Sequence, residues 1–200
     1  MDRIQMTAKL KEKLPAKRFE HSIGVEYTAG TMAFMYGVDY EKALIAGLLH
    51  DCAKYVPNDK KIQKCKKRGI SVSECEYHNP ELLHAKLSAI YAKEKYGVTD
   101  EEILSAIECH TTGKPEMSAL DKIIYIADYI EPMRNKAPNL SRVRETAFRD
   151  LDECMYEILR DMIVYLEENP KDLDKTSLGA FEYYTDLHIK RNKEVKTDGK

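Results

Sequence analysis

Apolar residues recur with helical spacing along almost the whole chain. From Arg18 a stripe of apolar and small residues repeats at steps of three and four positions and stops at Gly37. A second stripe follows Asp39, a candidate N-cap, and ends before Pro57. Steps of three and four place residues on one face of an α-helix. The pattern therefore predicts two long helices in the first quarter of the chain.

Four further helices are expected, each with its own start or stop signal. They run from about Pro80 to Gly97, from Thr99 to His110, from Ser118 to Pro132 and from Ala147 to Glu168. Thr99 with Glu102, and Ser118 with Asp121, have the spacing of capping boxes. The only candidate strand, residues 70–73, is four residues long. We predict an all-α fold with a single domain over residues 1–187 and a polar, flexible tail over 188–200.

Composition removes several classes of protein. Hydrophobic residues make up 43% of the 200 residues, enough for a core, and the net charge of −2 gives no general attraction to nucleic acid or anionic membranes. The longest uncharged run, from Tyr27 to Val38, is shorter than the ~18 residues of a membrane span. The first residues also lack the apolar core of a signal peptide. Five cysteines without CxxC spacing indicate reduced thiols and a cytoplasmic protein.

Six ionisable residues stand on or beside the apolar faces of five predicted helices, where hydrocarbon is expected. Taken singly, a histidine in such a place is most often a hydrogen-bonded core residue, and an aspartate could pair with an arginine. Burying an unpaired carboxylate costs several kcal/mol, roughly, and a shared cation removes that cost. The coincidence of all six therefore favours metal binding. The residues are His21, His50, Asp51, His84, His110 and Asp128.

The types of these side chains limit which metals can bind. No cysteines have ligand spacing, which argues against a cysteine-rich structural zinc site. Four imidazoles and two carboxylates are too many for one catalytic ion and suit two ions that share a bridging carboxylate. Iron, manganese, nickel and zinc all accept such ligands. Two ions about 3.5–4 Å apart would hold a bridging hydroxide, a nucleophile suited to attack on phosphorus.

These residues resemble a known signature. His21, the His50-Asp51 pair and Asp128 are similar to the H…HD…D pattern of HD-domain metal-dependent phosphohydrolases, and His84 with His110 resembles the subset that binds two metals. The surrounding segments RFEHS, GLLHDCAK, ECHTTG and IADYIEPMR resemble those of the bacterial YqeK family, the symmetrical bis(5′-nucleosyl)-tetraphosphatases. The resemblance extends from about residue 18 to residue 134 and implies a compact helical bundle of the HD type.

The resemblance also implies an activity and a division of the ligands. His21, His50, Asp51 and Asp128 would bind one ion, and Asp51 would bridge to a second ion bound by His84 and His110. The family implies iron as the metal and the hydrolysis of diadenosine tetraphosphate into two ADP. Three alternatives stay open: hydrolysis of another nucleotide, oxygenase chemistry at an HD-type di-iron site, and nucleotide binding without catalysis. The sequence does not decide whether the chain forms a homodimer.

A tetraphosphate needs cationic partners besides the metals. Lys54 follows Asp51 by three residues, which predicts that it lies one turn along the same helix. Arg18 precedes His21 by three residues, and Arg134 follows Asp128 by six. The arginine fork can bind two phosphate oxygens at once. We predict that Asp51, Lys54, Arg18 and Arg134 are catalytic, and that the three basic residues also bind substrate.

The segment after His110 offers further substrate contacts. Thr111 and Thr112 supply hydroxyl groups, and Gly113 supplies an open backbone N–H, so the three are predicted to line the phosphate site. A left-handed glycine that closes a helix explains Gly113 equally well. Two more residues have open roles: Glu131 would orient a ligand or pair with an arginine, and His78 would lie at the surface or in a lid.

Overall fold

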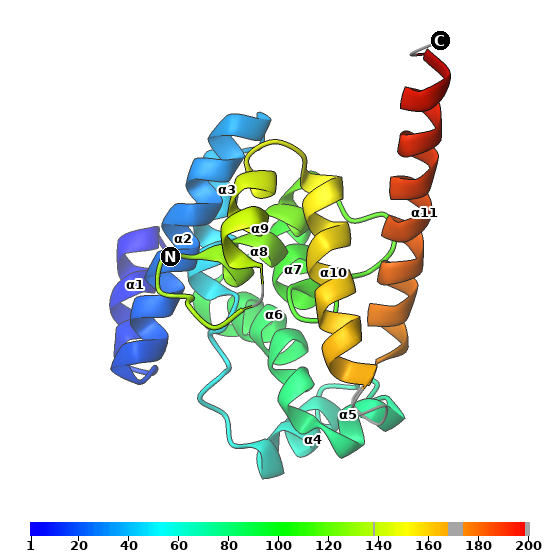
Figure 1. The fold of residues 1–200 in the computed structure, drawn as a ribbon. Coiled ribbons are helices and arrows are strands. Elements are labelled where there is room, and N and C mark those ends of the chain that lie inside the picture. The colour runs from blue at the N-terminus through cyan, green and yellow to red at the C-terminus, as the bar shows by residue number, and fades with distance from the viewer. Residues whose placement is uncertain (138, 168–173, 199–200) are drawn as a thin grey trace.

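The computed structural model describes residues 1–137, 139–167 and 174–198, which form helices joined by short turns (Figure 1). No β-strand occurs among these residues, so the all-α prediction is confirmed, and residues 70–73 lie in a connecting segment. The helices are α1 (Arg3–Lys11), α2 (Ala16–Tyr36), α3 (Tyr40–Leu49), α4 (Asn58–Lys66), α5 (Glu74–His78), the short 3-10 helix η1 (Pro80–Leu82), α6 (Leu83–Tyr96), α7 (Glu101–Cys109), α8 (Ala119–Ile130), α9 (Leu140–Ala147), α10 (Leu151–Glu167) and α11 (Lys175–Asp198).

Two of the three predicted N-caps begin their helices as expected. The Asp39 carboxylate accepts a hydrogen bond from the backbone N–H of Lys42 at 3.0 Å, and Ser118 with Asp121 forms a reciprocal capping box. The predicted box at Thr99 is wrong. Asp100 is the N-cap of α7 and accepts from two backbone N–H groups, because a carboxylate is a stronger acceptor than a threonine hydroxyl.

One predicted helix ends earlier than expected, and another begins later. The helix after Asp39 stops at Leu49, and residues 50–55 form successive turns in which Lys54 N–H donates to the carbonyl of Asp51. Residues 147–167 do not form one helix either. The carboxylate of Asp150 caps a new helix, α10, by accepting from the N–H groups of Asp152 and Glu153. The predicted end at residue 168 lies outside the described residues.

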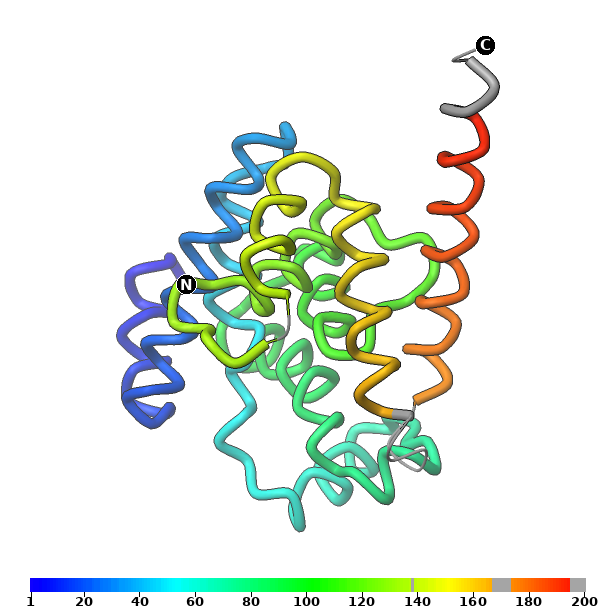
Figure 2. The backbone as a smooth tube through the Cα atoms, in the orientation of Figure 1, coloured from blue at the N-terminus to red at the C-terminus, as the bar shows by residue number. Residues whose placement is uncertain are grey.

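The sequence predicts a boundary between domain and tail at residue 188, and this position lies inside helix α11. Helix α11 continues through it to Asp198 and lies beside α10 (Figure 2), and its C-terminal end reaches past the other helices (Figure 1). His188 Nδ1 lies 2.6 Å from a carboxylate oxygen of Glu153, and Arg191 pairs with Asp150 and Asp152. These ion pairs hold polar residues of the expected tail against α10. Flexibility of the last residues stays a prediction.

Helices α2, α3, α7 and α8 pack around the core, and α6 and α10 cover it from two sides. Val25, Leu48, Ile107 and Ile124 contribute fully buried side chains from the four central helices. Gly47 permits the close packing of α3 on α2, because a Cβ there would lie 2.9 Å from the Cα of Glu26. Among the described residues, no helix is long and apolar enough to cross a membrane.

Candidate metal centre

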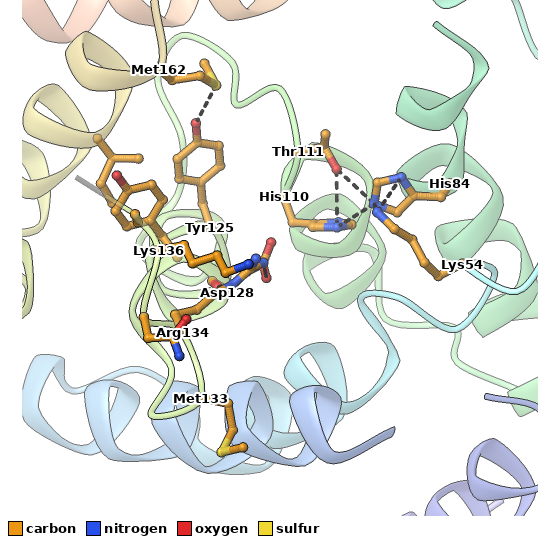
Figure 3. A pocket seen from close by; sticks show the side chains of 14 residues that line it. Lys54, His84, His110, Thr111, Tyr125, Asp128, Met133, Arg134, Lys136 and Met162 are labelled. Carbon is orange, nitrogen blue, oxygen red and sulfur yellow. Dashed lines mark hydrogen bonds and ion pairs between the residues drawn. The ribbon is translucent and has the colours of Figure 1, made fainter. Parts of the chain in front are cut away.

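Five helices bring the six predicted ligands to one place. His21 and Asp128 lie within α2 and α8, His84 lies in the first turn of α6, and His50, Asp51 and His110 directly follow the ends of α3 and α7. Five of the six residues are buried, and the side chain of Asp128 is 22% exposed. His84, His110 and Asp128 line a common cavity (Figure 3). Residues far apart in the sequence thus form one polar cluster in the apolar interior.

Asp51 lies between two pairs of imidazoles. Its Oδ2 atom is 3.5 Å from Nε2 of His50 and 4.0 Å from Nε2 of His21. Its Oδ1 atom is 3.2 Å from Nε2 of His84 and 3.7 Å from Nε2 of His110. One carboxylate therefore presents an oxygen to each pair, which is the arrangement of a carboxylate that bridges two ions.

The second nitrogen of every imidazole is fixed by a hydrogen bond. Nδ1 of His50 and of His110 each donates at 2.7 Å to the carbonyl three residues earlier, and Nδ1 of His84 donates to the carbonyl of Glu81. Nδ1 of His21 lies 3.1 Å from the carboxylate of Glu131. A proton on Nδ1 leaves the lone pair on Nε2 free to bind metal. All four Nε2 atoms face the centre.

Several polar atoms of the centre lack a suitable protein partner, and this tests whether a metal fits. Nε2 of His21 and of His50 are 3.3 Å apart, so their lone pairs face each other. Nε2 of His84 and of His110 are 3.2 Å apart, and the Thr111 hydroxyl lies within 3.2 Å of both. Among the described residues, the buried Oδ1 of Asp51 accepts no hydrogen bond. Cations satisfy all of these atoms at once. The side chains present therefore fit two metal ions with nitrogen and oxygen ligands.

Electrostatics keep the ligands in the forms that bind metal. Burial opposes ionisation of Asp51, but His50 and the other imidazoles hold the pKa of its carboxyl well below the usual range. Burial lowers the pKa of His84, which favours the neutral imidazole. Helices α3 and α7 also end at the centre, and the negative ends of their dipoles favour cations there.

The three predicted basic residues reach the centre and contact its carboxylates or imidazoles. Arg18 Nη1 lies 2.8 Å from Oδ2 of Asp51, and Arg134 Nη2 lies 2.7 Å from Oδ1 of Asp128. Lys54 Nζ lies 3.2 Å from Nε2 of His84. Lys54 belongs to the turns after α3 and not to that helix, contrary to the prediction. The turn is held by Ser88, whose hydroxyl oxygen accepts from the N–H of Ala53 at 3.0 Å.

Lys54 is held by Glu81, which in turn pairs with Lys61, and neither residue was predicted from the sequence. One carboxylate oxygen of Glu81 lies 3.0 Å from Lys54 Nζ, and the other pairs with Lys61, whose side chain is 1% exposed. Burial opposes ionisation of Glu81, but its hydrogen bonds from Lys61 and Lys54 lower its pKa. The three residues come from α4, η1 and the turn after α3, so no local spacing in the sequence marks them.

Of the segment after His110, only Thr111 reaches the centre. Its hydroxyl lies 3.2 Å from Nε2 of both His84 and His110. Thr112 and Gly113 line a different pocket beside α7, so their positions do not support the predicted contact with substrate. Gly113 has a left-handed backbone (φ 65°), and its N–H donates to the carbonyl of Cys109 at 2.8 Å. It therefore closes α7 and turns the chain away from the centre.

The structure places Glu131 at the centre and His78 away from it. Glu131 is 1% exposed and contacts Nδ1 of His21 with one oxygen, while its other oxygen accepts from the N–H of Met133 at 2.7 Å. Gly24 makes room for it, because a Cβ there would lie 2.6 Å from that oxygen. Glu131 thus orients a proposed ligand. His78 is exposed and lies in a separate pocket with Asp174.

We expect Glu131→Gln to weaken metal binding by about 10- to 100-fold, the usual effect of losing a partner that orients a histidine ligand. The amide removes the negative charge that favours the proton on Nδ1 of His21. Titration of metal-depleted protein with the metal measures the change, and Glu12→Gln, at an exposed glutamate, is the control. An unchanged metal affinity would show that Glu131 only packs against α2.

Two cavities open from the centre. The first, here the tyrosine cavity, has a volume of about 530 Å³ and is lined by His84, His110 and Asp128 at the centre and by Tyr125, Tyr129 and Met162 away from it (Figure 3). The second, here the arginine cavity, has a volume of about 540 Å³ and is lined by Arg18, His21 and Glu131. Met133 and Arg134 line both cavities.

Comparison with known protein families defines the class. The family model described as "HD domain" matches residues 18–133. The matched range contains all six side chains of the cluster and, except for the first two residues of α2, the helices that carry them, from α2 to α8. A helical fold with histidines and an HD pair at its centre is thus the fold of an HD-domain protein.

Curated and solved relatives narrow the assignment. The chain is 39% identical to the symmetrical bis(5′-nucleosyl)-tetraphosphatase of Bacillus subtilis, over 83% of this chain and 88% of the relative. It is 36% identical to the protein of that name from Staphylococcus aureus, over 87% and 90%. A crystal structure of a predicted HD superfamily hydrolase involved in NAD metabolism from Clostridium acetobutylicum superposes with a TM-score of 0.89, at 39% identity, over 94% of this chain and 98% of that one. The chain belongs to the HD-domain family of symmetrical bis(5′-nucleosyl)-tetraphosphatases.

Proposed function

We propose that this protein hydrolyses diadenosine tetraphosphate symmetrically, into two molecules of ADP, at a centre of two metal ions. The observation that carries the proposal is the position of Asp51, whose two oxygens each face a pair of imidazole Nε2 atoms. The names of the relatives from Bacillus subtilis and Staphylococcus aureus support the substrate and the position of cleavage.

The proposed ligands divide into two sets that share Asp51. His21, His50 and Asp128 would hold one ion with Asp51, and His84 and His110 would hold the other. When bound, the two ions polarise phosphoryl oxygens and activate water near neutral pH. The hydrogen bonds on Nδ1 fix each imidazole so that Nε2 faces the ions. We propose iron as the metal, with manganese, nickel and zinc as alternatives that suit the same ligands.

The basic side chains would bind the polyphosphate. Arg18 and Arg134 each use one N–H group on a carboxylate of the centre, and an arginine has further donors for phosphate oxygens. Lys54 would stabilise charge on the central phosphates as the bond between them breaks. One water molecule adds to one of the two central phosphorus atoms, and the central anhydride bond breaks. The two products are therefore both ADP.

The test is the product pattern of the purified protein loaded with iron or manganese. Release of ADP alone from diadenosine tetraphosphate is expected. Release of AMP with ATP would overturn symmetric cleavage. Oxygen consumption without ADP would indicate an oxygenase, and tight nucleotide binding without turnover would indicate a binding module. Metal analysis of protein purified without added metal tests the assignment of iron. A cytoplasmic location stays a prediction, and formation of a homodimer stays undecided.

A further inference from the structure

We propose that Glu81 is a positioning residue for the reaction. Its carboxylate holds the ammonium group of Lys54 beside the centre, and the buried Lys61 shares that carboxylate, so that Lys54 keeps positive charge for the phosphates. The inference rests on the proposed function and extends it to two residues outside the predicted site. Lys54 lines the tyrosine cavity, where its side chain lies beside His84 (Figure 3). The position and the charge of this one ammonium group therefore act on phosphates bound at the centre.

Glu81 contacts the centre through both its backbone and its side chain. It is the middle residue of η1, and its carbonyl oxygen accepts the hydrogen bond from Nδ1 of His84. One of its carboxylate oxygens lies 3.0 Å from Nζ of Lys54. Because the backbone contact fixes where Glu81 stands relative to the proposed ligand, the carboxylate can hold Lys54 at a defined distance from the reacting phosphates.

Lys61 is buried, which is rare for a lysine. Its side chain is 1% exposed, and its ammonium group donates to the second carboxylate oxygen of Glu81 and, at 2.7 Å, to Oδ1 of Asn58. Lysine is almost never fully buried without a partner, and an apolar side chain of similar volume often stabilises a fold as well or better. The buried charge therefore indicates a role that an apolar residue could not fill, which is to occupy one oxygen of Glu81.

Two lysines that share one carboxylate leave a positive charge uncompensated within these three side chains. Lys61 is too deeply buried to contact a ligand, whereas the side chain of Lys54 is 21% exposed and lines the cavity. An ammonium group has three N–H donors, and the contact with Glu81 uses one of them. Lys54 is therefore held in place before substrate binds, and it still has charge and donors for phosphate oxygens.

The experiment is a double-mutant cycle on metal-loaded protein, with Glu81→Gln, Lys54→Met and the two changes together. Glu81→Gln should lower kcat for diadenosine tetraphosphate about tenfold and raise KM by no more than about threefold, because a loosely held ammonium group stabilises the transition state less well. In protein that already carries Lys54→Met, the same change should alter kcat by no more than about twofold. Lys61→Met, which suits a buried position, should also lower kcat only while Lys54 is present.

Asp152 offers a matched control. Its carboxylate is also shared by two cations, since Lys122 lies at 2.7 Å from one oxygen and Arg191 at 2.6 Å from the other. These contacts join α8, α10 and α11, and Asp152 lines neither cavity of the centre. Asp152→Asn should therefore leave kcat and KM unchanged. Bound metal should equal that of the wild type in every variant, because no proposed ligand is altered.

The possible outcomes separate the inference from the proposed function. Additive losses in the cycle, or an unchanged kcat in Glu81→Gln, would overturn the inference. Loss of metal in Glu81→Gln would also overturn it, because the effect would then pass through His84. Failure of the wild-type protein to form ADP would instead overturn the proposed function. The cycle is then measured by calorimetry with inorganic tripolyphosphate, whose binding Glu81→Gln should weaken about threefold and only in the presence of Lys54.

Discussion

Asp51→Asn is expected to lower the rate of diadenosine tetraphosphate hydrolysis by about a thousandfold or more, because activation by the metal pair contributes several kcal/mol to such reactions. The two oxygens of Asp51 face different imidazole pairs. An asparagine has nearly the same shape but replaces one oxygen with an NH2 group that donates hydrogen bonds and does not bind metal. One of the two ions should therefore lose its bridging ligand.

Metal analysis and kinetics check this result together. The variant should retain fewer than two ions per chain. Its loss of activity should lower kcat more than it raises KM, because Asp51 acts on the reacting centre. Asp59→Asn is a matched control, since Asp59 is exposed in the first turn of α4. Circular dichroism would show that the variant folds. Two bound ions and an unchanged rate in Asp51→Asn would contradict a bridging role.

The six residues of the centre could be predicted because each one breaks a local rule. Each ionisable group stands on or beside an apolar face, and helical spacing shows that face in the sequence alone. His21 and Asp128 lie 107 positions apart, yet the structure places Nε2 of one 3.0 Å from Oδ1 of the other. The pattern predicts that such side chains turn inward. The resemblance to HD-domain proteins implies that they belong to one site.

The turns after α3 could not be predicted in the same way. The apolar stripe continues past His50 to Ala53, and no glycine or proline stands between them. The helix nevertheless ends at Leu49, because the N–H of Ala53 bonds to Ser88 on α6. That partner is 35 positions away in the sequence. The position of Lys54 therefore depends on a tertiary contact that helical periodicity does not contain.

Ion pairs between distant elements explain two further contacts that the sequence does not show. The charged composition around Lys61 indicates a surface lysine, but the side chain is buried because Glu81 neutralises it. The sequence predicts that His188 and Arg191 lie in a polar tail. In the structure, acidic residues around the start of α10 bind both side chains. A charged residue is assigned to the surface by composition alone. Only the fold shows which charged residues meet a partner.

Removal of the metals is expected to lower the melting temperature by roughly 10–20 °C. Each ion stabilises the folded chain by about 2.7 kcal/mol when its free concentration is 100 times its dissociation constant, and about 1 kcal/mol changes the melting temperature of a domain of this size by roughly 2–4 °C. Without the ions, the Nε2 atoms of His21 and His50 face each other at 3.3 Å, and Oδ1 of Asp51 is buried without a hydrogen-bond donor among the described residues.

Scanning calorimetry with and without a chelator measures the shift, and adding manganese back should restore it. The shift should be smaller in His84→Gln, which loses a proposed ligand, and unchanged in His78→Gln, which alters an exposed histidine outside the centre. It should also shrink at pH 5.5, because protons compete with metal for the imidazole nitrogens. A chelator that removes the metal without lowering the melting temperature would show that the fold compensates these buried lone pairs by itself, which would contradict the fit of the centre to two ions.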